Sequence, residues 1–374
     1  MQVTPVKSLA DQKAFLRFPY DLFRQDPGWI PPLWSAEQKA LDPAQNPSVE
    51  HSEVQRWLAR REGQVVGRIQ VIINAYETER LGEAHARFNK LDLIEDFAVA
   101  EALLHTAEQW ATEQGAVWLK GPHGYTNLDE SGMLVEGFET PTTFATLYNP
   151  AYYPQFLERL GYEKHVDWIE RRFDLPRELP DKVTRITTLL QQRYGLRTLP
   201  LRTRRDLLSV APRLMDLFLD SYADLEGFVP LSQAEIDLYI ERYIAFLRPD
   251  FARVVVDAQG EMVGFGLTMP DLGQAMRKAG GKLWPLGWYH LLQATRRNPI
   301  ANLILIGVVP QWRNKGVHGL IFREVYQSFR KVGIERIHVH PMMENNTPVH
   351  ALFQDYGAQP FRRRRVYQKL LGAK

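Results

Sequence analysis

Two parts of this chain carry the same pattern, and this repetition limits the folds that the chain can adopt. A strand–turn–strand pattern near the front of each half has a glycine in its second strand, Gly67 or Gly264, and these lie 197 residues apart. A short helix that ends at Gly161 or Gly357 closes each half, with an offset of 196 residues. Because the offsets agree at both ends, the sequence predicts a duplicated fold.

A third matched pair lies between these two. Gly115 and Gly333 each end a long amphipathic helix, but they are 218 residues apart, so each half has an insertion of its own. We expect the insertions at residues 121–149 and 269–299.

The segment 173–182 has two prolines, mixed charge and no apolar periodicity, so it is predicted to be a linker. We therefore expect two domains, residues 1–175 and 176–374. Strands alternate with helices in both, which predicts the α/β class, with a mixed sheet covered on both faces.

The composition excludes several classes of function. Lys+Arg 46 nearly balances Asp+Glu 44, so a nucleic-acid partner, which favours a basic excess, is not expected. The chain has no cysteine, which rules out disulfides and thiolate chemistry. The start of the chain has no apolar signal-peptide core, and no apolar run is long enough to span a bilayer. We expect a cytoplasmic protein with no membrane partner.

The most specific local feature is "VVPQWRNKGVHG", residues 308–319. It follows a wholly apolar strand and precedes an amphipathic helix. The first N–H groups of a helix lack partners and attract anions, and Gly316 allows a ligand to approach the backbone. Together with Arg313 and Lys315, this turn is suited to a pyrophosphate. An ordinary charged strand-to-helix turn would use the same residues.

This segment resembles the acyl-CoA-binding motif of the GNAT superfamily of N-acyltransferases, V-x-P-x-[YW]-R-x-x-G. The matching residues are Val308, Pro310, Trp312, Arg313 and Gly316. The elements that follow come in the family's order, and the first half fits the same order. The resemblance therefore implies two tandem GNAT-like domains, of which the second binds acetyl-CoA or another acyl-CoA.

The resemblance also implies roles for individual residues. In the family the strand before the turn separates from its neighbour, and the pantetheine arm pairs with the exposed backbone. An N–H group near Val308 would then polarise the thioester carbonyl. By position, the pantetheine and acyl group would contact Val308, Val309 and Asn345. The pyrophosphate would contact Arg313, Asn314, Lys315, Gly316, Val317, His318 and Gly319.

Three departures from the family pattern matter. His318 replaces a small residue, and its imidazole could crowd the phosphate or pair with it. Phe353 stands where the family often has a tyrosine as general acid. The first half has no such motif, and Glu95 and Asp96 at the corresponding turn would repel a pyrophosphate. We therefore expect that the first domain lacks the cofactor site.

Three residues are candidates for proton transfer. His340 alternates with His338 on a strand beside the proposed site and has the ordinary pKa range of a general base. Glu344 could act through a water molecule, and Tyr356 is the nearest phenol that could replace the missing acid. His340 and Tyr356 also have a purely structural reading, as a packed histidine and a packed aromatic ring.

The loop "GPHGYTNLDESG" in the first half is the candidate for binding the acceptor. His123, Asn127, Asp129 and Glu130 could bind a cationic amine. A surface loop held by Asx turns would have the same composition. No pattern of residues argues for a metal.

Two further segments stand out. "FRRRR", residues 361–365, is read as a solvated edge strand, with an RNA or phosphate site as the alternative. "LWPLGWYHLL", residues 283–292, is read as core or interface, with contact to a lipid, an acyl chain or a second copy as alternatives.

The sequence thus favours an acyl-CoA-dependent N-acetyltransferase that acts on a primary amine of a small molecule, and it leaves a homodimer open. The alternative is a non-catalytic protein with a duplicated GNAT fold that binds an acyl-CoA or another small ligand as a sensor.

Overall fold

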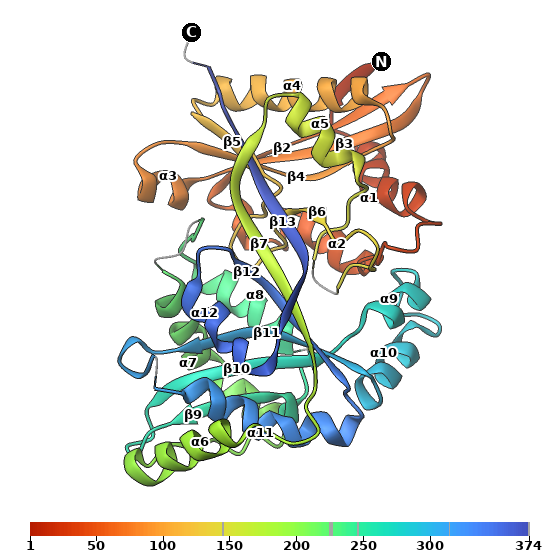
Figure 1. Ribbon diagram of the computed structural model, residues 1–374. Helices are drawn as coiled ribbons and strands as arrows, with labels where there is room; N and C mark the ends of the chain where they lie inside the picture. The colour runs from red at the N-terminus through yellow and green to blue at the C-terminus, as the bar shows by residue number, and fades with distance from the viewer. Residues whose placement is uncertain (144–145, 224–226, 245–246, 314, 373–374) are drawn as a thin grey trace.

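The computed structural model describes residues 1–143, 146–223, 227–244, 247–313 and 315–372. Its strands form one 13-stranded mixed sheet, with strands in the order β1-β2-β3-β4-β5-β13-β7-β12-β11-β10-β9-β8 and β6 paired to β13 (Figure 1). Alternating strands and crossover helices predicted such a mixed sheet, and the structure confirms it.

The first half contains β1 (Gln2–Pro5), α1 (Leu9–Leu22), α2 (Trp34–Leu41), η1 (Pro47–Val49), β2 (Ser52–Arg61), β3 (Gln64–Asn74), α3 (Ala75–Leu81), β4 (His85–Leu93), α4 (Phe97–Glu113), β5 (Trp118–Gly121), β6 (Met133–Glu136), α5 (Tyr152–Arg159) and β7 (Glu163–Asp174).

The second half contains α6 (Asp181–Tyr194), β8 (Arg197–Thr198), α7 (Arg204–Tyr222), α8 (Gln233–Ile244), η2 (Pro249–Phe251), β9 (Ala252–Val256), β10 (Met262–Pro270), α9 (Gly273–Ala279), α10 (Gly287–Arg296), β11 (Ile300–Val308), η3 (Pro310–Trp312), α11 (Val317–Val332), β12 (Arg336–Met343), α12 (Thr347–Leu352), η4 (Gln354–Tyr356) and β13 (Gln359–Leu370).

The strand order reads the same from both ends, as a duplication requires. Strands β1 to β5 of the first half take the places that β8 to β12 take in the second. The last strand of each half crosses to the other: β7 pairs with β12, and β13 pairs with β5. These two strands run side by side through the middle of the molecule and join the halves (Figure 1).

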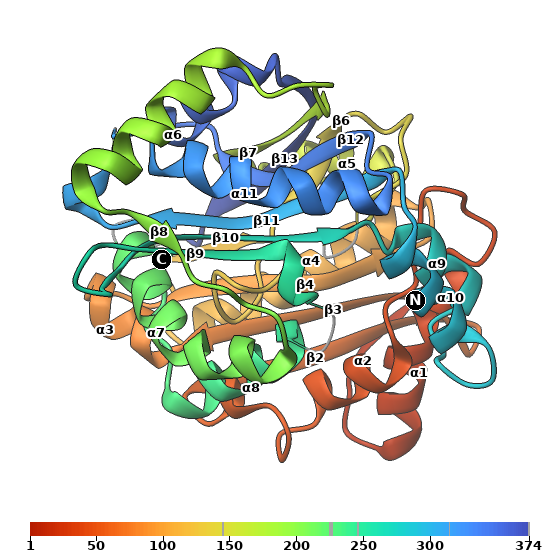
Figure 2. The same ribbon diagram turned by 90° about the horizontal axis from the view of Figure 1, so that it is seen from below.

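The matched glycines have matched surroundings. A Cβ on Gly67 would meet Val99 and Leu103 of α4, and a Cβ on Gly264 would meet Val317 at the start of α11. In both halves a glycine therefore lets the long helix lie close on the sheet. Helices α6 and α11 lie on one side of the second-half strands, and α7 lies on the other (Figure 2).

Replacing Gly266 with alanine should push α11 away from the sheet. The added Cβ would lie 2.4 Å from Cγ2 of Ile321, a stiff β-branched side chain. We expect a loss of about 1–3 kcal/mol in the free energy of unfolding, measured by urea denaturation. The control is Gly372→Ala, because nothing lies within 4 Å of its Cβ position. Equal stability of the two variants would contradict the close approach of α11.

The prediction that residues 361–365 form a solvated edge strand is wrong. Strand β13 lies in the middle of the sheet, between β5 and β7. Arg362 and Arg364 are 3% and 0% exposed, and both form ion pairs with Glu170 of β7, at 2.9 and 2.6 Å. An arginine-rich strand can be central when a neighbouring strand supplies the buried carboxylate.

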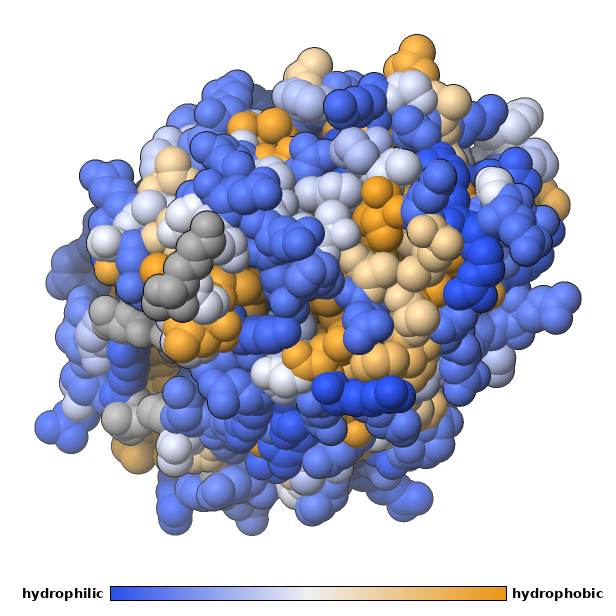
Figure 3. All heavy atoms as spheres, turned by 90° about the horizontal axis from the view of Figure 1, so that it is seen from above, coloured by the Kyte–Doolittle hydropathy of each residue, from blue (hydrophilic) through white to orange (hydrophobic). Residues whose placement is uncertain are grey.

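Viewed from the side of the first half, the surface is mostly hydrophilic, with apolar side chains in smaller groups (Figure 3). None of the helices in the described part of the chain combines the length and apolar character needed to cross a bilayer.

Candidate active site

Strands β11 and β12 separate in the middle of the second-half sheet. They pair in parallel from Ile300↔Arg336 to Leu303↔Val339, although β11 continues to Val308 and β12 to Met343. The register of β11 against β10 shifts at Ile304, because Leu303 pairs with Thr268 and Leu305 with Leu267. This β-bulge bends β11 and opens a gap between the two strands.

Backbone groups of β11 point into this gap. The N–H of Val309 donates to the carbonyl of Val263, on the β10 side, at 3.1 Å. Successive residues of a strand direct their N–H groups to opposite sides, so the N–H of Val308 points into the gap. The carbonyl of Ile306 also points there and accepts a hydrogen bond from the Tyr222 hydroxyl at 3.4 Å.

The turn after β11 leaves the start of α11 open. Its N-cap residue, Gly316, has no side chain, and its first turn has no acidic residue. Within the described part of the chain, no group accepts a hydrogen bond from the N–H of Lys315, Gly316 or Val317. Arg313 and Lys315 are exposed beside this helix end. The result is a local positive potential.

Several groups of the turn also make contacts within the protein. The Arg313 side chain donates to the Val308 carbonyl at 3.2 Å, and Lys315 lies over the ring of Trp312 at 4.8 Å. Gly319 is buried, and its N–H donates to the Gly316 carbonyl at 2.9 Å. Asn314 lies outside the described residues, and Asn345 is exposed in the turn after β12.

Glycine is required at position 316 for a structural reason that the sequence did not reveal. Its φ is +89°, which favours glycine. A Cβ there would lie 2.6 Å from Cγ2 of Ile186, because α6 packs on this turn. Replacing Gly316 would therefore disturb the fold as well as any ligand, and the site is better tested at Arg313 and Lys315.

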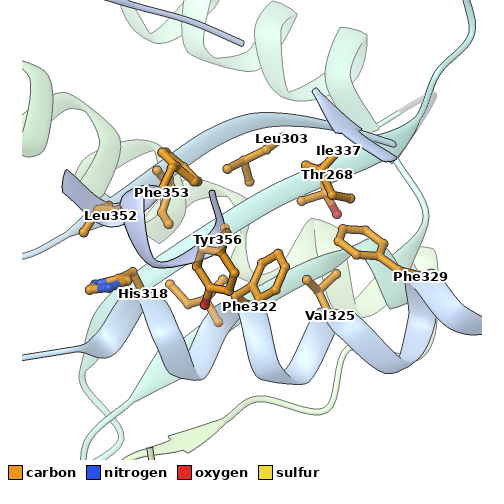
Figure 4. A pocket seen from close by; sticks show the side chains of 13 residues that line it. Thr268, Leu303, His318, Phe322, Val325, Phe329, Ile337, Leu352, Phe353 and Tyr356 are labelled. Carbon is orange, nitrogen blue, oxygen red and sulfur yellow. The ribbon is translucent and has the colours of Figure 1, made fainter. Parts of the chain in front are cut away.

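An apolar pocket lies between α11, η4 and the surface of β10–β12 (Figure 4). His318 lies at one end of it and is only partly buried. Phe353 is 4% exposed and faces the same space. Tyr356 stacks on Phe173, with ring centroids 5.5 Å apart. The pocket continues to Leu303 and Ile306 at the gap between β11 and β12.

The first half has the same topology, but there the protein's own atoms bind the groups that are open in the second half. These groups are the N–H groups at the start of the long helix and at the end of the strand before it. The side chain of Asp96 caps α4 and accepts from the N–H of Ala98 at 2.9 Å. The N–H of Leu93 at the end of β4 donates to the Tyr153 hydroxyl at 2.6 Å. The N–H of His123 donates to the Phe88 carbonyl at 2.9 Å. The prediction that this domain lacks a cofactor site is favoured by these contacts.

His338 and His340 lie on the other face of β12, toward the first half. Burial lowers the pKa of each to about 4, and the charges of Glu170, Arg362 and Arg364 act on them as well. Both imidazoles are therefore neutral at neutral pH. Nε2 of His340 is buried without a hydrogen-bond partner in the described part of the chain.

The other two catalytic candidates lie elsewhere. Glu344 forms an ion pair with Lys164 at 2.6 Å and lies 3.7 Å from Arg363, which alternates with the buried arginines and faces away from them. Tyr356 lies in the apolar pocket on the α11 side. The structure thus places His340, Glu344 and Tyr356 in three separate surroundings.

The candidate loop of the first half lies against the second half, and most of its polar groups hold it there. Asp129 accepts from the N–H of Tyr125 at 2.9 Å and from the Tyr239 hydroxyl at 3.1 Å. Asn127 accepts from the N–H of Val229 at 3.0 Å. His123 bonds to the Ser131 hydroxyl at 2.5 Å, and burial lowers its pKa well below the usual range.

Glu130 differs from these neighbours. Its carboxylate makes no hydrogen bond to another described residue and stays open to solvent. Protein nevertheless surrounds it closely, and this burial, followed by the charge of Glu37, raises its pKa. A carboxylate with a raised pKa is a stronger base than an ordinary glutamate and is suited to accept a proton.

The contacts on either side of Glu130 place its loop against the second half. Leu128 packs against the same apolar cluster as Leu305 of β11 and Tyr222 of α7. Gly132 accepts a hydrogen bond from Arg364, whose charge acts on His340. The loop therefore packs on the α7 side of the second half, opposite α11. Glu130 lies between these two contacts.

Two charged residues that act on Glu130 were not expected from the sequence. Lys90 and Glu37 form an ion pair at 2.6 Å, and the charges of both act on the Glu130 carboxylate. Lys90 has a φ of +47°, which is uncommon for a residue with a side chain. It lies at a shift in the register of β3 and β4, near the position of the β11 bulge in the repeat. No pattern in the sequence marks this shift.

The paired repeats, the separated strands and the open helix end define a class, the tandem GNAT-like acyltransferases. Residues 211–358 match the model of the "Acetyltransferase (GNAT) family". A tandem GNAT protein from the clavulanic acid biosynthesis pathway has the same fold, with a TM-score of 0.55, 15% identity and coverage of 100% of this chain and 99% of that chain.

Two relatives match over nearly their whole length. Protein YghO of Escherichia coli (strain K12) is 30% identical over 376 residues, which cover 96% of this chain and 93% of YghO. The bacterial ceramide synthase of Caulobacter vibrioides (strain NA1000 / CB15N) is 28% identical over 387 residues, covering 99% and 98%. This chain belongs to the GNAT family and is an acyltransferase with tandem GNAT domains.

Proposed function

We propose that this protein transfers an acyl group from an acyl-CoA to the primary amine of a long-chain acceptor. The observation that carries the proposal is the gap between β11 and β12, which opens beside the uncapped start of α11. An acyl-CoA needs both features. Its diphosphate binds to free N–H groups, and its pantetheine arm forms hydrogen bonds with the exposed edge of a strand.

The cofactor would enter from the α11 side. The N–H groups of residues 315–317 and the side chains of Arg313 and Lys315 would bind the diphosphate. The pantetheine arm would lie along Ile306 and Val308, and the N–H of Val308 would stabilise the negative charge that develops on the thioester oxygen. His318 would lie beside the arm at the end of the apolar pocket.

The acceptor would enter from the opposite face, between the halves. Its amine nitrogen attacks the thioester carbon, the carbon–sulfur bond breaks, and the thiolate of coenzyme A leaves. The amine must lose a proton in this step, and Glu130, an exposed carboxylate with a raised pKa, would accept it. His340, neutral with a free ring nitrogen, is the second group on that face.

A long-chain amine is supported by the relative named a ceramide synthase, because a ceramide is the amide of a long-chain amino alcohol. The apolar cluster of Leu33, Met269, Leu272, Met276 and Leu291 reaches Ile304 at the bulge of β11. An apolar chain attached to the amine would pack against these apolar side chains and leave water.

Calorimetric titration with coenzyme A tests the cofactor site. Arg313→Glu with Lys315→Glu should weaken binding at least tenfold, because two cations at the diphosphate become two anions. Both side chains are exposed, so the fold should persist. The matched control is Lys331→Glu in the last turn of the same helix. Equal affinity of the double variant and the control would contradict the assigned site.

Release of the coenzyme A thiol tests for turnover. The chain has no cysteine, so a thiol reagent sees no protein background. We expect thiol release with long-chain amines and an acyl-CoA. Binding of coenzyme A without release across a series of such amines would instead support the sensor function.

A further inference from the structure

The insertion of the second half carries an unusual surface. Fourteen large apolar side chains are exposed in the described part of the chain, and six of them fall within residues 283–292. They are Leu283 (41% exposed), Trp284 (81%), Leu286 (61%), Trp288 (51%), Tyr289 (48%) and Leu292 (40%). From the sequence we expected this segment to lie in the core or an interface, and the exposure of these side chains excludes the core for them.

Charge on this surface has one sign only. From Leu272 to Pro299 the sequence has no carboxylate. Lys278, Lys282, Arg296 and Arg297 of this segment are all exposed. Helices α9 and α10 project at the edge of the molecule, away from the sheet (Figures 1 and 2).

We infer that this surface, the exposed side chains of residues 278–297, docks on the anionic surface of a lipid bilayer. Tryptophan and tyrosine favour the boundary between lipid and water, and leucine enters the apolar layer. Lysine and arginine around them are attracted to anionic head groups. This replaces our expectation from the sequence that the protein has no membrane partner.

A second copy of the chain fits this surface less well. In a symmetric dimer the same surface would face itself, so eight exposed cations would meet with no carboxylate of the segment to offset them. An anionic lipid surface supplies the missing negative charge.

The inner face of α10 connects this surface with the candidate active site. Leu291 packs in one apolar cluster with Met269, Met276 and Leu33, and Ile304 at the β11 bulge packs against that cluster. This part of the inference rests on the proposed function: an acceptor with a long apolar chain would leave the bilayer at α10 and reach the gap along this cluster.

Sedimentation with lipid vesicles tests the docking without acyl-CoA or acceptor, so its outcome is independent of turnover. The full chain is mixed with vesicles of phosphatidylglycerol and phosphatidylethanolamine, or of phosphatidylcholine alone. We expect sedimentation with the anionic vesicles. Trp284→Ser with Trp288→Ser should reduce the bound fraction at least tenfold, and Lys278→Glu with Lys282→Glu should reduce it on anionic vesicles.

The matched control is Leu189→Ser with Leu208→Ser, two side chains that are 55% and 47% exposed elsewhere on the second half. The control should bind like the unaltered chain, and coenzyme A affinity should be the same in all variants. The inference fails if the unaltered chain stays in the supernatant with anionic vesicles. It also fails if the tryptophan variant binds as well, or if that variant only dissociates a dimer seen by analytical ultracentrifugation.

Discussion

Replacing Glu130 with glutamine should lower the rate of acyl transfer by about 10²–10⁴-fold, the usual contribution of a general base. Glutamine has the same shape and cannot accept the proton of the amine. Affinity for coenzyme A should not change, because Glu130 lies on the face opposite α11. The measurement is the rate of thiol release at saturating acyl-CoA and amine.

The stability of this variant separates a catalytic role from a structural one. Burial raises the pKa of Glu130, so the folded state favours its protonated form. The stability from this group is present below its unfolded pKa and is lost as pH rises through its folded pKa. At neutral pH, Glu130→Gln should therefore unfold at the same temperature as the unaltered chain or higher.

The pH profile supplies a further readout for Glu130. Activity of the unaltered chain should rise with pH and inflect above the ordinary range of a glutamate, about 4.3. The residual activity of Glu130→Gln should lack this inflection. Glu139→Gln, an exposed residue of the first half, is the control. Full activity of Glu130→Gln would leave His340 as the base, and His340→Gln would then be inactive.

Glu170→Gln should lower the free energy of unfolding by about 3–5 kcal/mol, since it leaves two buried guanidinium groups without a counter-charge. Arg362 and Arg364 both pair with this one carboxylate, which is 1% exposed. Urea denaturation at neutral pH measures the loss. The control is Asp174→Asn in the exposed pair with Arg336, 75% and 47% exposed, which should change stability by less than about 0.5 kcal/mol.

The same pair predicts a dependence on pH. Burial alone would raise the pKa of Glu170. The positive charges of Arg364 and Arg362 lower it by more, so the pKa of Glu170 lies below its usual range. Its stabilisation is present above the unfolded pKa and is lost as pH falls through the folded pKa. Stability should thus decline in acid in the unaltered chain and decline less in Glu170→Gln. Equal slopes would contradict the ion-pair account.

The duplicated architecture could be predicted because each half uses the same local signals. Glycines with φ of +80° and +81° end the long helices at Gly115 and Gly333, and tight turns at Gly63 and Gly260 join the hairpins. The helix α11, Val317–Val332, ends at Gly333 as predicted. Local backbone requirements of this kind are visible in a sequence.

The crossing of β7 and β13 between the halves could not be predicted. Strand pairing depends on partners far apart in the chain, and the alternation of "FRRRR" suits an edge strand and a central strand equally. Burial of Arg362 and Arg364 follows from Glu170, 192 residues away from Arg362. Nothing near the arginines in sequence indicates this partner.

The candidate site was predicted in part. The turn at residues 308–319 lies where a strand opens and a helix starts, as the motif implied. The candidate loop was identified, but the sequence could not separate Glu130 from Asp129 and Asn127. Only the hydrogen bonds show that the latter two hold the loop, whereas Glu130 is left open.

A crystal structure of the protein with a non-hydrolysable acyl-CoA analogue tests the central claim most directly. We predict diphosphate oxygens within hydrogen-bond distance of the N–H groups of Lys315, Gly316 and Val317, with the pantetheine arm between β11 and β12. The acyl carbonyl should face the N–H of Val308, with Glu130 on the opposite side. An analogue bound in the first half, or a gap closed by the protein's own side chains, would contradict this account.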